Sequence, residues 1–65
     1  MADIKISLAS ARVNAGLTQE EVAERMNCAK NRLINLEKGR VKIKPTELVF
    51  LSTLYNIPVD NIFLP

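Results

Sequence analysis

The chain of 65 residues contains no histidine, no tryptophan and a single cysteine. Without histidine there is no cluster of the side chains that bind transition metals, and one cysteine cannot form an internal disulfide. The sequence also lacks a glycine-rich phosphate loop and a pair of carboxylates at a plausible catalytic position, so an enzyme is the weakest interpretation. We therefore expect no catalysis, no metal and no cofactor.

Long apolar stretches are also missing. No run approaches the roughly 18 residues that a membrane-spanning helix needs. Residues 1–5, Met-Ala-Asp-Ile-Lys, lack the basic start and long apolar core of a secretion signal. These absences predict a cytoplasmic protein that has no membrane partner and no evident small-molecule ligand.

The composition is that of one small folded domain covering residues 1–65. Hydrophobic residues make up 48% of the chain and charged residues 25%, which is too apolar for a disordered segment. A chain of this size buries roughly 60% of its unfolded surface and keeps only a few kcal/mol of net stability. We expect a single core, with no deep cleft.

Positive charge is concentrated in one part of the sequence. The net charge is only +2, yet seven of the nine basic residues lie between positions 25 and 44, where Glu37 is the only acid. Such a patch attracts a polyanion, and nucleic acid is the commonest one in a cytoplasm. A merely solvated basic face is the alternative. The seven residues are Arg25, Lys30, Arg32, Lys38, Arg40, Lys42 and Lys44.

Two short helices joined by a tight turn are predicted in the same region. Thr18 and Glu21 have the spacing of a capping box, so a helix should run over residues 19–26. Asn27 tolerates the left-handed conformation and can bend the chain into a second helix over residues 29–37. Apolar residues at helical spacing define the buried sides of the two helices. They are Val22, Ala23 and Met26 in the first helix, and Ala29, Leu33 and Leu36 in the second.

The opposite side of the second helix carries side chains suited to reading base edges in a DNA major groove. Lys30 could donate to guanine, and Asn31 or Asn35 could pair with adenine. Ile34 could meet a thymine methyl, but an exposed isoleucine could equally be a packing or dimer residue. We therefore interpret Lys30, Asn31, Ile34 and Asn35 as candidate base-reading residues.

Helices are also predicted on both sides of this pair. Ile4, Leu8, Ala11 and Ala15 recur at helical spacing, which indicates a helix over residues 6–15 with Ser7 as a candidate cap. Pro45 favours the start of another helix, over residues 45–55. Residues 40–44 alternate between basic and apolar, but we expect a loop there because no partner strand is evident. Gly16 and Gly39 suit the ends of the helices that precede them.

These residues resemble the helix-turn-helix of the lambdoid phage repressor and Cro superfamily, often called XRE-type. The resemblance implies a compact all-α bundle of five helices, similar to the DNA-binding domain of lambda repressor, with a last short helix over residues 59–63. The helix-turn-helix would consist of the second and third helices. The resembling segments are residues 15–23 (AGLTQEEVA), Leu33, Leu36, Glu37, Gly39, residues 51–57 (LSTLYNI) and residues 60–63 (DNIF).

The resemblance also implies roles for particular residues. Arg12 and Glu37 match a structural ion pair, which we expect to be partly buried and bidentate, the alternative being two independent surface charges. Gln19 would contact the DNA backbone and brace Lys30, although it could be only a solvent-exposed helix former. The loop over residues 40–44 would follow the sugar-phosphate backbone. We expect phosphate contacts from Gln19, Arg32, Lys38, Arg40, Lys42 and Lys44.

The C-terminal end has more apolar side chains than a small domain can bury. Residues 57–63 should supply core contacts, Phe63 among them, and the remainder should form a subunit contact. The predicted dimer interface consists of Ile57, Pro58, Val59, Phe63 and Leu64.

Together these features predict a regulator that binds double-stranded DNA sequence-specifically. We expect a homodimeric repressor on a pseudo-palindromic operator. One alternative is an antitoxin or a restriction-modification controller that regulates its own operon. An alternative of another class is a protein-interaction adaptor, which would use Ile34 and the C-terminal apolar residues.

Overall fold

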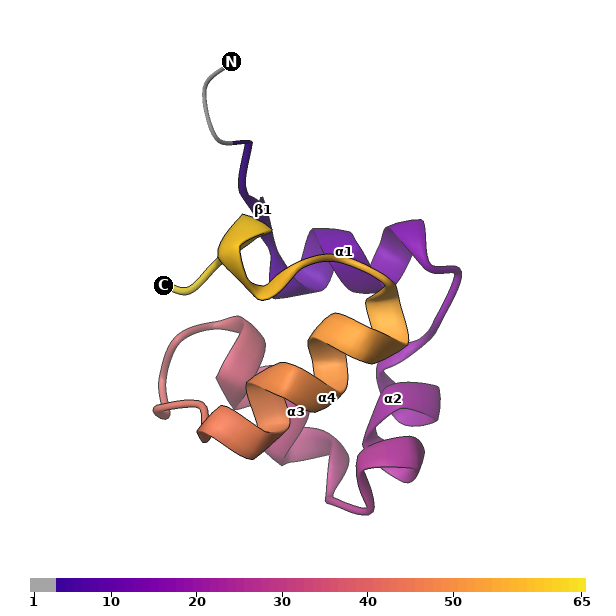
Figure 1. The fold of residues 1–65 in the computed structure, drawn as a ribbon. Helices are drawn as coiled ribbons and strands as arrows, with labels where there is room; N and C mark the ends of the chain where they lie inside the picture. The colour runs from indigo at the N-terminus through magenta and orange to yellow at the C-terminus, as the bar shows by residue number, and fades with distance from the viewer. Residues whose placement is uncertain (1–3) are drawn as a thin grey trace.

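A computed structural model of the chain describes residues 4–65 and shows four α-helices (Figure 1). The first three residues of the predicted domain lie outside the described residues. The predicted count of five helices is not confirmed, because four α-helices and one short 3₁₀ turn are present over residues 4–65. In chain order the elements are β1 (Ile6–Ser7), α1 (Leu8–Asn14), α2 (Gln19–Met26), α3 (Lys30–Glu37), α4 (Pro45–Tyr55), the 3₁₀ turn η1 (Val59–Asn61) and β2 (Ile62–Phe63).

Helix α1 begins two residues later than predicted. Ser7 is its N-cap, and its hydroxyl accepts a hydrogen bond from the backbone N–H of Ser10 at 3.1 Å. Leu8 and Ala11 are buried as expected. The other two members of the predicted stripe are not in the core, because Ile4 precedes the helix and is 66% exposed, and Ala15 is exposed after its end.

The helix-turn-helix has the predicted local chemistry. Both hydrogen bonds of the Thr18–Glu21 capping box form, and α2 has the expected bounds. Asn27 ends α2 with a left-handed backbone, at φ 57°. Helix α3 then starts at Lys30 because Ala29 has the extended backbone of an N-cap, so Ala29 is exposed and not part of the buried stripe. The side chains that hold the two helices onto the core are Val22, Ala23, Leu33 and Leu36.

Helix α4 also has the predicted bounds, with Pro45 at its first position and Asn56 left-handed at its end, at φ 56°. The segment before it, residues 40–44, forms a loop without helix or strand, as expected. Gly39 precedes that loop with φ 73°, and a Cβ there would lie 2.7 Å from Cγ of Pro65. A side chain at position 39 would therefore meet both backbone strain and the C-terminal residue.

The predicted helix over residues 59–63 is present only in its first part, as the 3₁₀ turn η1, while Ile62–Phe63 form strand β2 of a two-stranded parallel sheet. Ile6 pairs with Ile62 and Ser7 with Phe63, so the fold is not purely α-helical. The extended backbone points successive side chains to opposite sides. Ile62 therefore enters the core, while Phe63 is 53% exposed, which makes its assignment to the core wrong.

One hydrophobic core joins the ends of the chain to the helices. Its buried members come from α1, α2, α3, α4 and β2, and Leu17 packs against them from the loop before α2. In Figure 1, α4 crosses in front of α3, and the C-terminal segment returns to β1. The buried cluster consists of Leu8, Ala11, Val22, Leu33, Leu51, Tyr55 and Ile62.

Over residues 4–65, none of the helices is both long enough and apolar enough to cross a membrane. The same residues include no group of three histidine, cysteine or acidic side chains that could hold a metal ion.

Candidate nucleic-acid interface

The predicted base-reading residues lie along the side of α3 that faces away from its leucines. Lys30 and Asn31, in the first turn, are exposed. Ile34 and Asn35, one turn later, are half-buried. Leu33 and Leu36, on the other side of the helix, are 0% and 2% exposed. Helix α3 is therefore fixed by its leucines and presents its polar first turn to solvent.

Lys30 is held by Glu20 and not by Gln19. Its Nζ donates to Oε2 of Glu20 at 2.8 Å, and the two side chains are 47% and 66% exposed. The hydrogen bond from Lys30 holds the pKa of the Glu20 carboxyl below its ordinary value of 4.5. Lys30 thus donates to Glu20 in place of the expected Gln19, whose Nε2 donates to Glu37.

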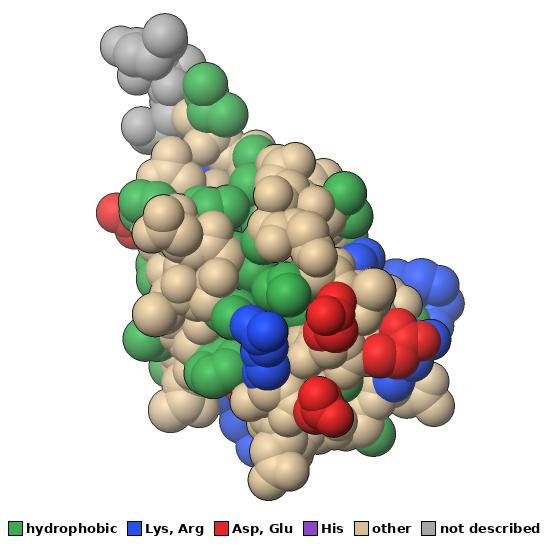
Figure 2. All heavy atoms as spheres, turned by 90° about the vertical axis from the view of Figure 1, so that its right-hand side faces the viewer, with side chains coloured by type: hydrophobic (Ala, Val, Ile, Leu, Met, Phe, Trp, Pro, Cys, Tyr) green, Lys and Arg blue, Asp and Glu red, His purple; other side chains and the backbone are tan. Residues whose placement is uncertain are grey.

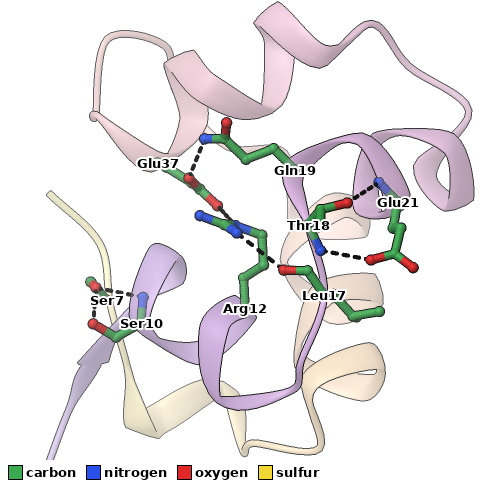
Figure 3. Close-up of polar contacts among 8 residues, drawn as sticks. All are labelled: Ser7, Ser10, Arg12, Leu17, Thr18, Gln19, Glu21 and Glu37. Atoms are coloured by element: carbon green, nitrogen blue, oxygen red, sulfur yellow. Dashed lines mark hydrogen bonds and ion pairs between the residues drawn. The ribbon is translucent and has the colours of Figure 1, made fainter.

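Gln19 belongs to a hydrogen-bonded network around Glu37 (Figure 3). One Glu37 oxygen, Oε1, accepts from Nε2 of Gln19 at 3.0 Å, and the other, Oε2, accepts from Nε of Arg12 at 2.7 Å. Nη1 of Arg12 donates to the backbone oxygen of Leu17 at 3.1 Å. The network ties α1, the start of α2 and the end of α3 together.

The Arg12–Glu37 ion pair is thus present, with 15% and 5% of the two side chains exposed. Its predicted bidentate geometry is wrong. Arg12 divides its donors between the carboxylate and the Leu17 carbonyl, because the loop between α1 and α2 passes beside the guanidinium. The arginine therefore fixes the entry to α2 as well as the end of α3.

Tyr55 from α4 is buried close to this network. Among residues 4–65 its hydroxyl has no hydrogen-bond partner. Burial raises the pKa of Tyr55 to about 12, and the negative charge of Glu37 acts in the same direction. The hydroxyl therefore stays protonated over the whole physiological range.

Arg32, one of the predicted phosphate contacts, is paired with a carboxylate within the fold. Its Nε and Nη2 donate to the two carboxylate oxygens of Glu47, at 3.0 and 2.8 Å. Glu47 accepts in addition from the backbone N–H of Lys44 at 2.9 Å, which caps the start of α4. The hydrogen bond from Arg32 holds the pKa of Glu47 below its ordinary value of 4.5. This pair joins α3 to α4.

Four other predicted phosphate contacts are accessible. Lys38, Arg40, Lys42 and Lys44 are all exposed, at the end of α3 and in the loop that follows. The direction of that loop is set locally, since the backbone N–H of Arg40 donates to the carbonyl of Asn35 at 2.9 Å. The basic loop is therefore attached directly to the helix that carries the candidate base-reading side chains.

The outer side of α2 has the opposite charge. Figure 2 views the molecule from the side of α2 and shows acidic side chains gathered there, with basic side chains beside them. The exposed acids of α2 are Glu20, Glu21 and Glu24. A phosphate backbone would be attracted to the basic end of α3 and to the loop that follows it.

Sequence reasoning did not find the roles of Glu20 and Glu47. Each pairs with a cation on α3, at separations of 10 and 15 residues, which match no helical or strand period. The one available signal was the presence of an acid near the start of α2 and a base at the start of α3. Which acid pairs with which base depends on how the helices cross.

Comparison with known proteins agrees with this geometry. The helix-turn-helix family model HTH_3 matches residues 8–62. The HTH-type transcriptional regulator ImmR of Bacillus subtilis (strain 168) is 42% identical over 53 residues, which cover 82% of this chain and 42% of ImmR. The competence pilus inhibition repressor of Acinetobacter baylyi (strain ATCC 33305 / BD413 / ADP1) is 32% identical over 62 residues, which cover 95% of this chain and 56% of that repressor.

The chain thus spans about half the length of these two relatives. No solved structure gives a significant match. The family match includes α1 to α4 and with them the whole helix-turn-helix. The chain belongs to the XRE-type helix-turn-helix family of DNA-binding transcriptional regulators.

Proposed function

We propose that residues 1–65 form one DNA-binding domain that represses transcription by binding, as a homodimer, to a pseudo-palindromic operator. The observation that carries this proposal is the exposed polar first turn of α3, held outward by leucines on the other side of the same helix. That arrangement suits a recognition helix whose N-terminal residues meet base edges in the major groove.

In this proposal the exposed side of α3 reads the sequence. Lys30 donates to guanine, and Asn31 and Asn35 pair with adenine. Ile34 is half-buried, so a part of its side chain is available for a thymine methyl. Asn35 is also half-buried, so we expect Lys30 and Asn31 to contribute most of the discrimination.

The phosphates are contacted by the basic end of α3 and its loop. Lys38, Arg40, Lys42 and Lys44 supply affinity that does not depend on sequence. Gln19 is the first residue of α2, and the backbone N–H groups at a helix start have no partner within the helix. Together with the helix dipole, these N–H groups favour contact with a DNA phosphate at this position. The side chain of Gln19 remains with Glu37.

Apolar side chains at the C-terminal end support the homodimer. Val59, Phe63 and Leu64 are 38%, 53% and 41% exposed. Pro58 is exposed and Ile57 is half-buried beside them in the sequence. Burial of this surface against a second copy would give a two-fold dimer with two α3 helices for two half-sites. A dimer bound to promoter DNA in the cytoplasm would repress by occlusion, and one relative is named a repressor.

Selection of bound sequences from a pool of random duplexes tests the function. We expect enrichment of a site with two half-sites related by two-fold symmetry, their centres about 10 base pairs apart. An enriched site without symmetry would contradict the homodimer. Equal binding of every duplex at low ionic strength would contradict sequence-specific binding altogether.

A further inference from the structure

An exposed ion pair connects the first turns of α2 and α3. Glu20 is the second residue of α2 and Lys30 is the first residue of α3, and their head groups are 2.8 Å apart. Both side chains remain open to solvent, at 66% and 47%. A ligand that reaches Lys30 therefore also reaches the Glu20 carboxylate.

The pair offers donors and an acceptor side by side. The Lys30 ammonium has three N–H donors, of which Glu20 uses one, so two remain. The carboxylate accepts from Lys30 through Oε2 and is also close to its own backbone N–H, but two carboxylate oxygens offer about four acceptor positions, so it can accept one more hydrogen bond. The exposed ion pair can thus donate two hydrogen bonds through Lys30 and accept one through the neighbouring Glu20 carboxylate.

A G·C pair has the complementary pattern in the major groove. Guanine presents two adjacent acceptors, N7 and O6, and its cytosine presents the N4 amino donor next to them. In an A·T pair the adenine amino group separates the two acceptors N7 and O4, so one ammonium cannot use both in the same way. The order of donors and acceptor on the Lys30–Glu20 ion pair therefore favours a G·C base pair over an A·T base pair.

We propose that Glu20 is a specificity-determining residue that reads one G·C pair of each half-site together with Lys30. This inference rests on the proposed function. Lys30 donates to N7 and O6 of guanine, and the Glu20 carboxylate accepts from the cytosine amino group. Glu20 also restricts the Lys30 side chain to positions over the same base pair.

The charge of Glu20 distinguishes its pairing with Lys30 from the pairing of Lys30 with Gln19 that the sequence predicted. An amide such as Gln19 could both donate and accept beside Lys30, whereas a carboxylate only accepts. The hydrogen bond from Lys30, the backbone N–H of Glu20 and the charges of Lys30 and Arg12 lower the pKa of Glu20, and the carboxylate of Glu21 is its acidic neighbour. Glu20 is therefore ionised throughout the pH range of a binding measurement, and the base preference should not change between pH 6 and 8.

The test uses the duplex selected from a random pool and its single-pair variants. The base pair that Lys30 reads is identified first. It is the position of the duplex at which the Lys30→Ala variant no longer prefers one base pair over the others. Glu20→Ala is then compared with Glu24→Ala, which removes the same charge one turn further along α2, where the acid is exposed. Thermal unfolding followed by circular dichroism checks that each variant is folded.

We expect Glu20→Ala to lower the preference for G·C over A·T at that pair by about tenfold, and to leave other positions unchanged. In a Lys30→Ala background the same substitution should have no further effect on preference. Glu24→Ala should strengthen binding to all duplexes alike, because it removes one negative charge.

Equal behaviour of the Glu20 and Glu24 variants would overturn this inference and leave the proposed function intact. A preference for A·T at the pair read by Lys30 would also overturn it. If the unmodified chain selected no sequence from the pool, both the proposed function and this inference would fail.

Discussion

The basic side chains around α3 differ in how deeply their carboxylate partners are buried. Arg12 and Arg32 are each bound by a carboxylate that is at most 15% exposed, Glu37 and Glu47 respectively. Lys30 is paired at the surface, and its partner is 66% exposed. The two arginines therefore stabilise the domain, whereas the exposed lysine keeps two N–H donors with which it can reach a base.

Arg12→Ala should destabilise the domain strongly. It leaves the Glu37 carboxylate nearly buried without its cation and removes the hydrogen bond to the Leu17 carbonyl. We expect a loss of about 3 kcal/mol in the free energy of unfolding, measured with urea. The control is Arg25→Ala, since Arg25 is exposed, and it should stay within about 0.5 kcal/mol of the unmodified chain. Equal effects of the two substitutions would contradict the structural role of Arg12.

The Arg32–Glu47 pair predicts a dependence of stability on pH. The folded state lowers the pKa of Glu47 below 4.5, so the stabilisation is present above pH 4.5 and is lost as pH falls through the lower folded value. Glu47→Gln should be less stable than the unmodified chain at pH 7, and the difference should shrink as pH falls from 5 to 3. Urea unfolding at several pH values measures this difference. A constant difference would contradict the pairing.

The exposure of Lys30 and Asn31 could be predicted from the sequence, but the half-burial of Ile34 and Asn35 and the ion-pair partners of α3 could not. Lys30 and Asn31 lie opposite Leu33 and Leu36 because 3.6-residue periodicity fixes which side of a helix faces the core. Whether Lys30 meets Gln19 or Glu20 depends on the crossing of two helices. The sequence therefore predicted the candidate base-reading surface and missed both the Glu20 and the Glu47 contacts.

Whole elements were predictable wherever their signals are local. The capping box before α2, Pro45 at the start of α4 and the left-handed residue Asn27 each act within a few residues. Strands β1 and β2 have two residues each and pair across the length of the chain, so no local pattern reveals them. For the same reason the segment over residues 59–63 was predicted as a helix, while its pairing with β1 makes its second part extended.

The turn between α2 and α3 should depend on the left-handed backbone of Asn27. Asn27→Ala adds the strain of a Cβ without the local hydrogen bonding of asparagine, and should cost about 1 kcal/mol of unfolding free energy. Asn27→Gly should change it by less than about 0.5 kcal/mol, since glycine adopts this conformation without strain. Urea unfolding measures both.

Asn14→Ala is the matched control, because Asn14 is an exposed residue within α1 and should tolerate alanine. An Asn27→Ala variant as stable as Asn14→Ala would show that the left-handed turn does not contribute to stability.

The whole molecule has three different surfaces. The end of α3 and its loop are basic, the outer side of α2 is acidic (Figure 2), and the C-terminal segment exposes apolar side chains. This division suits a protein that meets DNA at one surface and a second copy at another. The apolar surface includes Phe63, whose exposure follows from the alternation of β2.

The proposed dimer should depend on Phe63. Phe63→Glu would bring a charge into the interface and should raise the dimer dissociation constant by about tenfold or more, measured by sedimentation equilibrium. Val13→Glu is the control, because Val13 is 63% exposed on α1 and lies outside the proposed interface. Equal weakening by both substitutions, or a chain that is monomeric at every concentration, would contradict the proposed interface.

The most direct test of the account compares Asn31→Ala with Lys42→Ala in binding to the selected duplex and its single-pair variants, over a range of salt concentrations. If α3 reads the bases and its loop contacts phosphates, Asn31→Ala changes the base preference at one position of each half-site. Lys42→Ala weakens binding to all duplexes alike and lowers the salt slope by roughly 0.9. An unchanged base preference in Asn31→Ala, Lys30→Ala and Asn35→Ala would contradict the assignment of α3 as the recognition helix.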